Sequence, residues 1–516
     1  MRFGRRQFLQ NVGSGAALAV VAGCASKSSN PSSTGPTGHD HNGVHDHSVQ
    51  LPAGAIQPND ASVLAAEQRR IAPNATTIRH TLVSETTTVD IGGRLIETAT
   101  FGGTLPGPVI RGTTGDLVEI TLHNRLAEAT AVHWHGLSLR NDMDGVLGVT
   151  QPGIAPAATY EYAFALPSPG THWYHSHAGL QLDRGLYAPF IIDDPDEPAD
   201  YDIEHLIVLD DWIDGFGATP DDLFDQLRCE PTCANDNRLG KFTSDLLGGD
   251  AGSINYPAYL VNGRMSTDPD TLVAAPGARV RLRIINAAAE TVFHLAVGGH
   301  TMQVTHTDGN AVDPHETDSL LLSVGERYDA IITVRSGVWP IVAIAEGKRA
   351  VATGLLRSSD TDPQASPAPT PPQRLAEHDR RLGDILEMRS RPREVFDFSS
   401  PDLTFDVTLS GGNGNYRWRL NGDTYGNNES LTVREGQRLR LNLINTSNVW
   451  HPMHLHGHAY RVGTTPNSVI KDTLLVKTGA SHTIDVICDN PGQWMLHCHN
   501  AYHFEAGMAI PFSYIS

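Results

Sequence analysis

The sequence predicts an all-β chain of three tandem sandwich domains, and three observations lead to that fold class. At 516 residues the chain is long for one hydrophobic core, so two to four domains are expected. One ten-residue pattern occurs three times: Gly, apolar residues at offsets three, five and seven, and Asn at offset nine. Such alternation indicates a half-buried strand that ends at a turn residue. The 49 Gly and 32 Pro residues between short alternating segments favour sandwiches over helices.

The spacing of this repeat predicts three domains of similar size. The copies occupy residues 115–124, 277–286 and 436–445. We therefore assign residues 71–198, 199–357 and 395–516 to the three domains, with a linker at residues 358–394. In the middle domain, His294 has no second histidine at pair spacing. That domain is predicted to hold no metal ligand, and His294 to lie in a core or an interface.

The first residues are typical of an export signal. Arg5 and Arg6 precede an apolar stretch that is too short to span a membrane, so residues 1–24 are predicted to be a twin-arginine signal. The stretch ends in Val-Ala-Gly-Cys24, which resembles a lipoprotein cleavage box. We expect Cys24 to carry lipid and to anchor the protein to a membrane of the cell envelope or periplasm. The alternative is ordinary signal cleavage with an incidental Cys24.

Residues 25–70 are rich in Ser, Pro, Gly, Asn and Ala, which predicts a disordered tether. Within it, His39, His41, His45 and His47 form a tract that either binds metal loosely or is a solvated linker.

Charge and cysteine content limit the partners and the redox chemistry. The net charge of −20 argues against nucleic acid and favours cations such as Cu(I) or Fe(II) as partners. Cys229 and Cys233 are predicted to form a local disulfide, because no second cysteine or histidine pair accompanies them to make a zinc site. Cys488 is expected to be a buried free thiol.

A cluster near the C-terminus has the composition of a blue copper site. Cys498, His503 and Met508 offer a thiolate, an imidazole and a weak axial thioether. A second imidazole must come from elsewhere, and His451 is the best candidate. Because alternate side chains of a strand point to opposite faces, His497 and His499 must face something other than this site.

Four pairs of histidines share a two-residue spacing, and together they offer more imidazoles than one metal ion can bind. An isolated pair would be interpreted as a surface or core feature, but four pairs together with the cysteine and methionine indicate a metal cluster. The pairs are His133/His135, His175/His177, His454/His456 and His497/His499.

These segments resemble the four signatures of the multicopper oxidases. The resemblance implies cupredoxin-like Greek-key domains and four copper ions. It assigns His451, Cys498 and His503 to the type 1 copper, with Met508 as the axial ligand. It assigns His133 and His454 to the type 2 copper. The binuclear type 3 pair would be held by the remaining six: His135, His175, His177, His456, His497 and His499.

The resemblance also implies an activity. A monomeric oxidase would take single electrons from Cu(I), Fe(II) or phenols, through whichever edge of His451 or His503 faces solvent, and reduce O2 to water. Copper detoxification is the expected role. Three alternatives stay open: a phenol-oxidising laccase with no metal-oxidase role, a non-catalytic copper-binding scaffold, and a copper nitrite reductase.

Two carboxylates are candidate proton carriers for this reaction. Asp144 resembles the family's acid beside the type 2 copper, although a turn residue before Gly145 is an equal interpretation. Glu505 is the second candidate. Some bacterial members place an acid directly after the last histidine, where this chain has Phe504.

Overall fold

The computed structural model describes residues 50–197, 200–229, 236–362, 373–391, 398, 400–412 and 416–516. The predicted signal, Cys24, the histidine tract at residues 39–47 and Cys233 lie outside the described residues.

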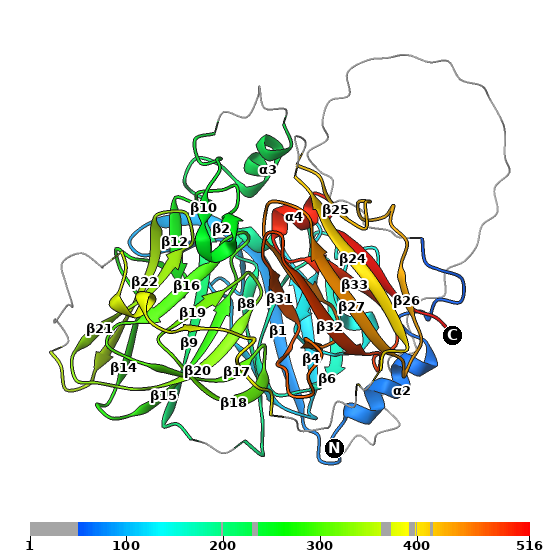
Figure 1. The fold of residues 1–516 in the computed structure, drawn as a ribbon, viewed down its shortest axis with the longest axis horizontal. Coiled ribbons are helices and arrows are strands. Elements are labelled where there is room, and N and C mark those ends of the chain that lie inside the picture. Colours follow the sequence, from blue (N-terminus) through cyan, green and yellow to red (C-terminus); the bar gives the residue numbers. More distant parts are fainter. Residues whose placement is uncertain are drawn as a thin grey trace. The chain divides into compact units, whose positions relative to one another are not determined.

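Six larger sheets, two to each domain, form three β-sandwiches (Figure 1). The first sandwich joins the sheet β2 (Leu95–Phe101), β1 (Thr77–Asp90), β4 (Leu117–Asn124) and β6 (Thr159–Ala165) to the sheet β3 (Ile110–Thr113), β8 (Tyr187–Asp193), β7 (Gly170–Ser176) and β5 (Val132–His135).

The middle sandwich has the larger sheets. One is β13 (Arg264–Met265), β12 (Ala258–Val261), β9 (Ile203–Trp212), β15 (Arg279–Asn286), β20 (Arg327–Thr333), β17 (Met302–Thr307) and β18 (Asn310–Thr317). The other is β14 (Thr271–Ala274), β22 (Ala350–Ser358), β21 (Val338–Ala345), β16 (Phe293–Val297), β19 (Ser319–Leu322) and β23 (Leu382–Gly383). A separate small sheet pairs β10 (Thr243–Ser244) with β11 (Gly249–Asp250).

The third sandwich carries most of the predicted copper ligands. Its first sheet is β25 (Trp418–Leu420), β24 (Leu403–Gly411), β27 (Arg438–Asn445), β32 (Ser481–Ile487), β29 (Tyr460–Val462) and β30 (Ile470–Lys471). Its second sheet is β26 (Leu431–Val433), β34 (Ala509–Tyr514), β33 (Gln493–Cys498), β28 (His451–Leu455) and β31 (Thr473–Val476).

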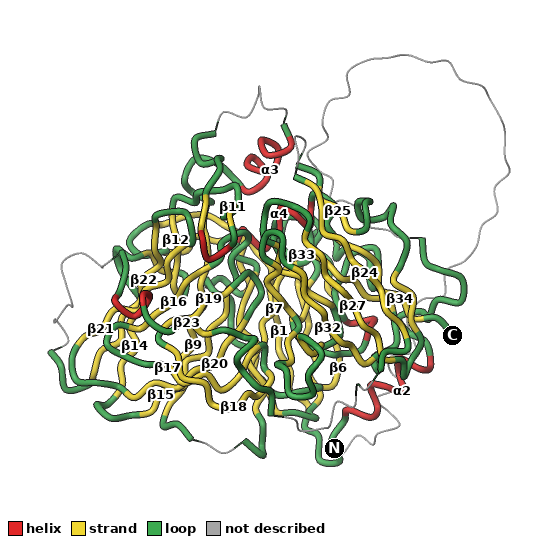
Figure 2. The backbone as a smooth tube through the Cα atoms, in the orientation of Figure 1, coloured by secondary structure: helices red, strands yellow, loops and turns green. Residues whose placement is uncertain are grey.

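Helices are few and short among the described residues (Figure 2). They are α2 (Ala61–Arg70), α3 (Pro220–Arg228), α4 (Ala501–Glu505) and the 3-10 turns at Asn141–Met143, Leu182–Arg184, Asp245–Leu247 and Ala376–Asp379. None of the helices in the described part of the chain has both the length and the apolar character needed to cross a bilayer.

The three sequence repeats form equivalent strands, β4, β15 and β27, and the terminal Asn braces the same loop in each. The side-chain amides of Asn124, Asn286 and Asn445 each donate to backbone carbonyls at 2.7–3.1 Å. Their side-chain oxygens each accept the backbone N–H two residues ahead. Because a buried turn must satisfy its own polar groups, the Asn of the repeat is explained by this bracing.

Alternating burial holds for β4 and β27 but is wrong for β15, which is buried along almost its whole length. The side chains of Arg281 and Arg283 are only 2% exposed. Arg281 donates to Asp329 at 2.5 and 3.0 Å, and Arg283 donates to Thr171 of the first domain at 3.0 Å. The polar face of this strand is therefore buried at a domain interface, where charge pairing replaces hydration.

Part of the predicted tether is a docked helix, which corrects the expectation of disorder through residue 70. The side chain of Val63 on α2 is fully buried. Glu67 accepts the backbone N–H of Ala165 in β6 at 2.5 Å, and Arg70 donates to Asn490 of the third domain at 2.9 Å. Composition pointed to a linker because it does not register these contacts with distant strands.

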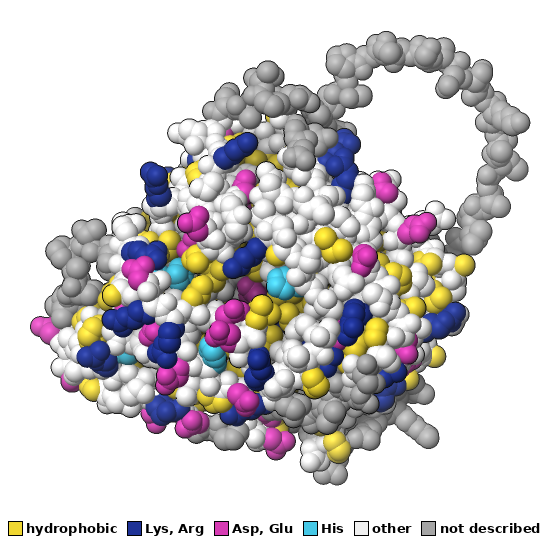
Figure 3. Space-filling model, in the orientation of Figure 1, with side chains coloured by type: hydrophobic (Ala, Val, Ile, Leu, Met, Phe, Trp, Pro, Cys, Tyr) yellow, Lys and Arg dark blue, Asp and Glu magenta, His cyan; other side chains and the backbone are white. Residues whose placement is uncertain are grey.

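The linker at residues 358–394 is also partly regular in its described portion, since β23 pairs with β19 of the middle domain. Cys488 is a buried free thiol, as predicted. Cys229 is disulfide-bonded. On the face seen in Figure 3, acidic and basic side chains are interspersed.

Candidate metal centre

One buried site gathers a cysteine and two histidines of the third domain. His451 begins β28, Cys498 ends β33 and His503 lies on α4. The Cys498 Sγ atom lies 3.5 Å from His451 Nδ1 and 3.6 Å from His503 Nδ1, and the two nitrogens are 3.2 Å apart. Donors bound at about 2.0–2.3 Å to one metal ion lie about 3.3–3.7 Å apart, so this triangle fits a single ion. Buried Met508 borders it, because its backbone carbonyl accepts the N–H of Cys498 at 3.0 Å.

The protonation of this site suits metal binding. Burial lowers the pKa of His451 to about 3 and that of His503 well below its usual range, so both imidazoles are neutral. Burial also raises the pKa of the Cys498 thiol. A metal ion is therefore needed to displace the thiol proton, and a soft ion that accepts thiolate and imidazole suits the donor set.

Neither histidine of this site presents an edge to solvent, which corrects our expectation for electron entry. His451 and His503 are 0% and 1% exposed. The ring of Trp418 lies 4.2 Å from that of His503 and 5.1 Å from that of His451, and the ring of Tyr416 lies 6.0 Å from that of His503. An electron can therefore reach His503 across these rings, whereas His451 Nε2 also lies 2.9 Å from the hydroxyl of half-buried Ser447.

The four histidine pairs lie in a second buried site between the first and third domains. Antiparallel pairing sets His133 opposite His175 on β5 and β7, and His454 opposite His497 on β28 and β33. Adjacent strands thus place two pairs side by side on each domain. Ligand-type nitrogens lie within 4.8 Å of one another in three groups: His133/His135/His454, His135/His175/His499 and His177/His456/His497.

This grouping separates the residues expected at the type 3 pair into two sets of three. In the set His177, His456 and His497, the Nε2 atoms of His456 and His497 lie 3.0 Å apart. In the set His135, His175 and His499, His499 Nε2 lies 3.1 Å from His135 Nδ1. The residues expected at the type 2 copper, His133 and His454, share the remaining group. Cys498 of the first site lies between His497 and His499 in the chain, so the two sites are joined by backbone.

Asp144 lies inside this second site. It is fully buried, and its carboxylate accepts from His456 Nδ1 at 2.9 Å and lies 3.2 Å from His133 Nδ1. The backbone carbonyl of Asp144 also accepts from His133 Nδ1 at 2.9 Å. Since Nδ1 of each ring donates to Asp144, Nε2 carries the lone pair that faces inward.

Asp472 has an equivalent position on the opposite side, and the sequence did not single it out. Its carboxylate accepts from His135 Nε2 at 3.1 Å, and its backbone carbonyl accepts from His454 Nδ1 at 2.9 Å. Thr473 Oγ1 contacts the same two rings at 3.0 and 3.2 Å. Asp472 is the single residue between β30 and β31, 337 residues from His135, and no motif marks it.

Unpartnered nitrogens in this site test whether metal ions fit. The Nε2 atoms of His133, His175 and His454 are buried with no hydrogen-bond partner among the described residues. A buried polar atom without a partner is costly and needs an explanation. Burial also lowers the pKa of His175 and of His454, so these rings are neutral and can each offer a nitrogen lone pair to a metal ion. Metal ions bound to these nitrogens satisfy the atoms that the protein leaves unpaired.

Glu505, the second candidate proton carrier, is not among the residues grouped with the clustered histidines in the described part of the chain. The side chain is half-buried, and burial raises its pKa to about 7, with a smaller contribution from Asp221 on α3. The ring of Phe504 instead lies 4.9 Å from the rings of His177 and His497. The second proton route through Glu505 stays a prediction.

The middle domain adds no residue to these ligand groups within the described part of the chain. Its His294 is buried and hydrogen bonded to Ser319 at 2.9 Å.

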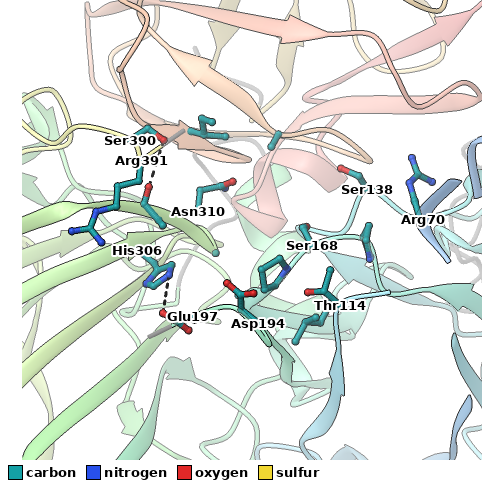
Figure 4. Close-up of a pocket in the computed structure, with 18 of the residues that line it drawn as sticks. Arg70, Thr114, Ser138, Ser168, Asp194, Glu197, His306, Asn310, Ser390 and Arg391 are labelled. Carbon is teal, nitrogen blue, oxygen red and sulfur yellow. Dashed lines mark hydrogen bonds and ion pairs between the residues drawn. The ribbon is translucent and has the colours of Figure 1, made fainter. Parts of the chain in front are cut away.

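A cavity of about 520 Å³ is lined by His306, which pairs with Glu197 and faces Asn310 and Arg391 (Figure 4). None of the described residues that line this cavity is a predicted copper ligand.

Comparisons with known proteins give a consistent result over the whole chain. Family models described as multicopper oxidase match residues 83–197, 237–361 and 398–515. The multicopper oxidase MmcO of Mycobacterium tuberculosis is 41% identical over 522 residues, which cover 100% of this chain and 97% of that protein. Copper resistance protein A of Escherichia coli is 28% identical, over 82% of this chain and 90% of that protein. The solved laccase of Botrytis aclada is 26% identical, with a TM-score of 0.69 and 92% and 93% covered.

Proposed function

Because the chain belongs to the multicopper oxidase family and is an oxidase that uses O2, we propose that its electron donors are Cu(I) and Fe(II), with phenols as a further class. We propose that it acts in copper detoxification. The similarity to a protein named for copper resistance supports this role.

The cofactor is a set of four copper ions, one of type 1, one of type 2 and two of type 3. When bound, these ions supply the one-electron redox steps that connect the donor to O2. We propose that His451, Cys498 and His503 hold the type 1 ion, with Met508 axial, and that His133 and His454 hold the type 2 ion. The type 3 ions are then held by His135, His175 and His499 on one side and by His177, His456 and His497 on the other.

In this arrangement the protein does three things. Cys498 joins the two sites, because its own backbone continues directly into His497 and His499. Asp144 and Asp472 hold the rings of the second site in one tautomer, so that the inward nitrogens stay unprotonated. The buried setting of both sites excludes bulk water, which strengthens each of these hydrogen bonds.

The observation that carries the choice of donor is the acidic surrounding of α4, the helix that bears His503. Asp183, which is buried, accepts from the hydroxyl of Tyr502 at 2.5 Å. Glu505 is the last residue of the same helix and is half-buried, and the charge of Asp221 on α3 adds to the rise of its pKa. Burial raises the pKa of Asp183 well above its usual range and keeps that carboxyl neutral, so the negative charge comes from Asp221 and from Glu505, which ionises as the pH rises through about 7. This charge raises the local concentration of cations and does not attract neutral phenols.

Steady-state kinetics with Cu(I), Fe(II) and a phenol, run in parallel by O2 uptake, test this proposal. We expect kcat/KM for the metal ions to exceed that for the phenol at least about tenfold, about 1.4 kcal/mol of discrimination. Glu505→Gln should raise KM for Fe(II) and leave KM for the phenol unchanged. A phenol preferred over both ions, with no effect of E505Q, would overturn the choice of donor.

A laccase that oxidises phenols is the second candidate, because the chain is similar over 92% of its length to a solved laccase. The same three-donor comparison decides between the two. We also propose export to the cell envelope and a lipid on Cys24, on the basis of the signal-like first 24 residues. Mass measurement of the mature N-terminus in wild type and Cys24→Ala tests the lipid.

A further inference from the structure

The middle domain holds no proposed copper ligand, but its Arg327 pairs with Asp472, and Asp472 is hydrogen bonded to two proposed ligands. Arg327 begins β20, and its guanidinium pairs with the carboxylate of Asp472 in the third domain. Nη1 donates to Oδ1 at 2.7 Å and Nη2 donates to Oδ2 at 2.6 Å. Arg327 is fully buried and Asp472 is 2% exposed. Two parallel charge-assisted bonds of this kind fix orientation as well as distance.

The orientation of Asp472 matters because its oxygens contact rings from two domains. Oδ1, which accepts from Arg327, also accepts from His135 Nε2 of the first domain at 3.1 Å. The carbonyl oxygen of the same residue accepts from His454 Nδ1 at 2.9 Å. A rotation of the Asp472 side chain would therefore leave His135, a proposed type 3 ligand, with Thr473 Oγ1 as its remaining contact at this nitrogen. A shift of the Asp472 backbone would do the same to His454, a proposed type 2 ligand.

Arg327 is itself held from several directions. Nε donates to the carbonyl of Thr171 in the first domain at 3.1 Å. The backbone N–H of Arg327 donates to Asp308 at 2.8 Å, and Asp308 also accepts the backbone N–H groups of Asp472 and Thr473 at 3.2 Å. The guanidinium therefore contacts all three domains at one point.

Gly136, the residue after His135, packs directly against the Arg327–Asp472 ion pair. Gly136 has a φ of +86°, and a Cβ at this position would collide with the Arg327 guanidinium and lie 2.8 Å from Asp472 Oδ2. The glycine thus lets the backbone beside a proposed ligand press directly against the ion pair.

We propose that Arg327 is a positioning residue of the three-copper site, through which the copper-free middle domain sets the geometry of His135 and His454. The proposal rests on the copper ligands proposed above. It predicts that a change at Arg327 alters the type 2 and type 3 ions and leaves the type 1 ion, where the donor delivers its electron, unaffected.

The test is Arg327→Lys in the full, copper-loaded protein, because lysine keeps the charge and loses the two-pronged contact. We expect a changed type 2 EPR signal and a lower kcat, by up to the about 10- to 100-fold that follows when a ligand loses its partner, because Arg327 acts through Asp472, the partner of His135 and His454. KM for the donor and the blue visible band should match wild type. Either donor class serves in this assay, so the result does not depend on whether Cu(I) or a phenol is preferred.

Arg461→Lys is the matched control. Arg461 is also buried and donates to buried Asp485 at 2.6 Å, and Asp485 also accepts from Arg440 instead of from a proposed ligand. We expect R461K to lower thermal stability and to leave the EPR signal and kcat unchanged. If R327K behaves in the same way, Arg327 is only an interdomain ion pair and the proposal is wrong.

A second variant covers the case in which R327K does not fold. The double substitution R327Q/D472N removes both charges together, so neither is left buried alone. We expect the type 2 EPR signal to change here as well. A wild-type signal and kcat in this variant would overturn the proposal.

Discussion

Replacing Asp144 by Asn tests whether its carboxylate holds the three-copper site in its working tautomer. One carboxylate oxygen accepts from His456 Nδ1 at 2.9 Å and the other lies 3.2 Å from His133 Nδ1. An amide supplies one acceptor only, so its NH2 group must face one of these two ring N–H groups. His133 keeps its bond to the Asp144 backbone carbonyl at 2.9 Å, which the substitution does not alter.

The expected loss follows from this count. Removing a partner of a metal ligand costs about 10- to 100-fold in metal affinity or activity, about 1.4 to 2.7 kcal/mol. Because one of the two rings keeps its backbone bond, we expect about a tenfold loss in kcat for D144N. The blue band should be unchanged, because the hydrogen bonds of His451 and the contacts of Cys498 Sγ do not include Asp144.

The assay is O2 uptake at saturating donor, with copper content and the type 2 EPR signal measured on the same sample. Asp142→Asn is the control, since Asp142 lies in the same turn and pairs with Arg140 at 2.5 Å instead of with a histidine. A D144N protein with wild-type kcat and EPR signal, or a D142N protein with the same loss, would refute the reasoning.

Three further predictions concern the cover of the first site, an interface and the N-terminal helix. Trp418→Ala should cost about 3–5 kcal/mol in thermal unfolding and, by uncovering His503, speed phenol oxidation relative to Fe(II); an unchanged donor ratio counts against the cover. Burial alone would raise the pKa of Asp329, but two arginines outweigh it and lower that pKa, so its stabilisation is complete above about pH 4 and lost in more acidic solution. Asp329→Asn should therefore shrink the difference in melting temperature between about pH 7 and about pH 3, and an equal difference contradicts this. Val63→Ala should cost about 2 kcal/mol, whereas Leu64→Ala, at a site 40% exposed, should be nearly neutral; equal effects contradict a docked α2.

The fold class followed from a pattern that depends only on local physics. Glycine, alternation and a terminal Asn are needed wherever a half-buried strand ends in a braced turn, so β4, β15 and β27 were visible in the sequence. The full burial of β15 was not, because the partners of Arg281 and Arg283 come from other strands and another domain.

The same division applies to the site. The histidine pairs and Cys498 could be found because a ligand pair must keep its spacing along a strand. Asp472 and Arg327 are one aspartate and one arginine among many, and only the packing of three domains brings them to His135. Solvent exposure was likewise beyond the sequence, since the burial of His451 and His503 depends on Trp418 and on distant segments.

The most direct measurement of the central claim compares copper-loaded wild type and Cys498→Ser for the blue visible band and for O2 uptake. If Cys498 is the link between the two sites, the wild type shows an intense blue band, and C498S loses both the band and O2 uptake while its type 2 EPR signal persists. A wild type without the band, or a C498S protein that still consumes O2 at the wild-type rate, would contradict the account.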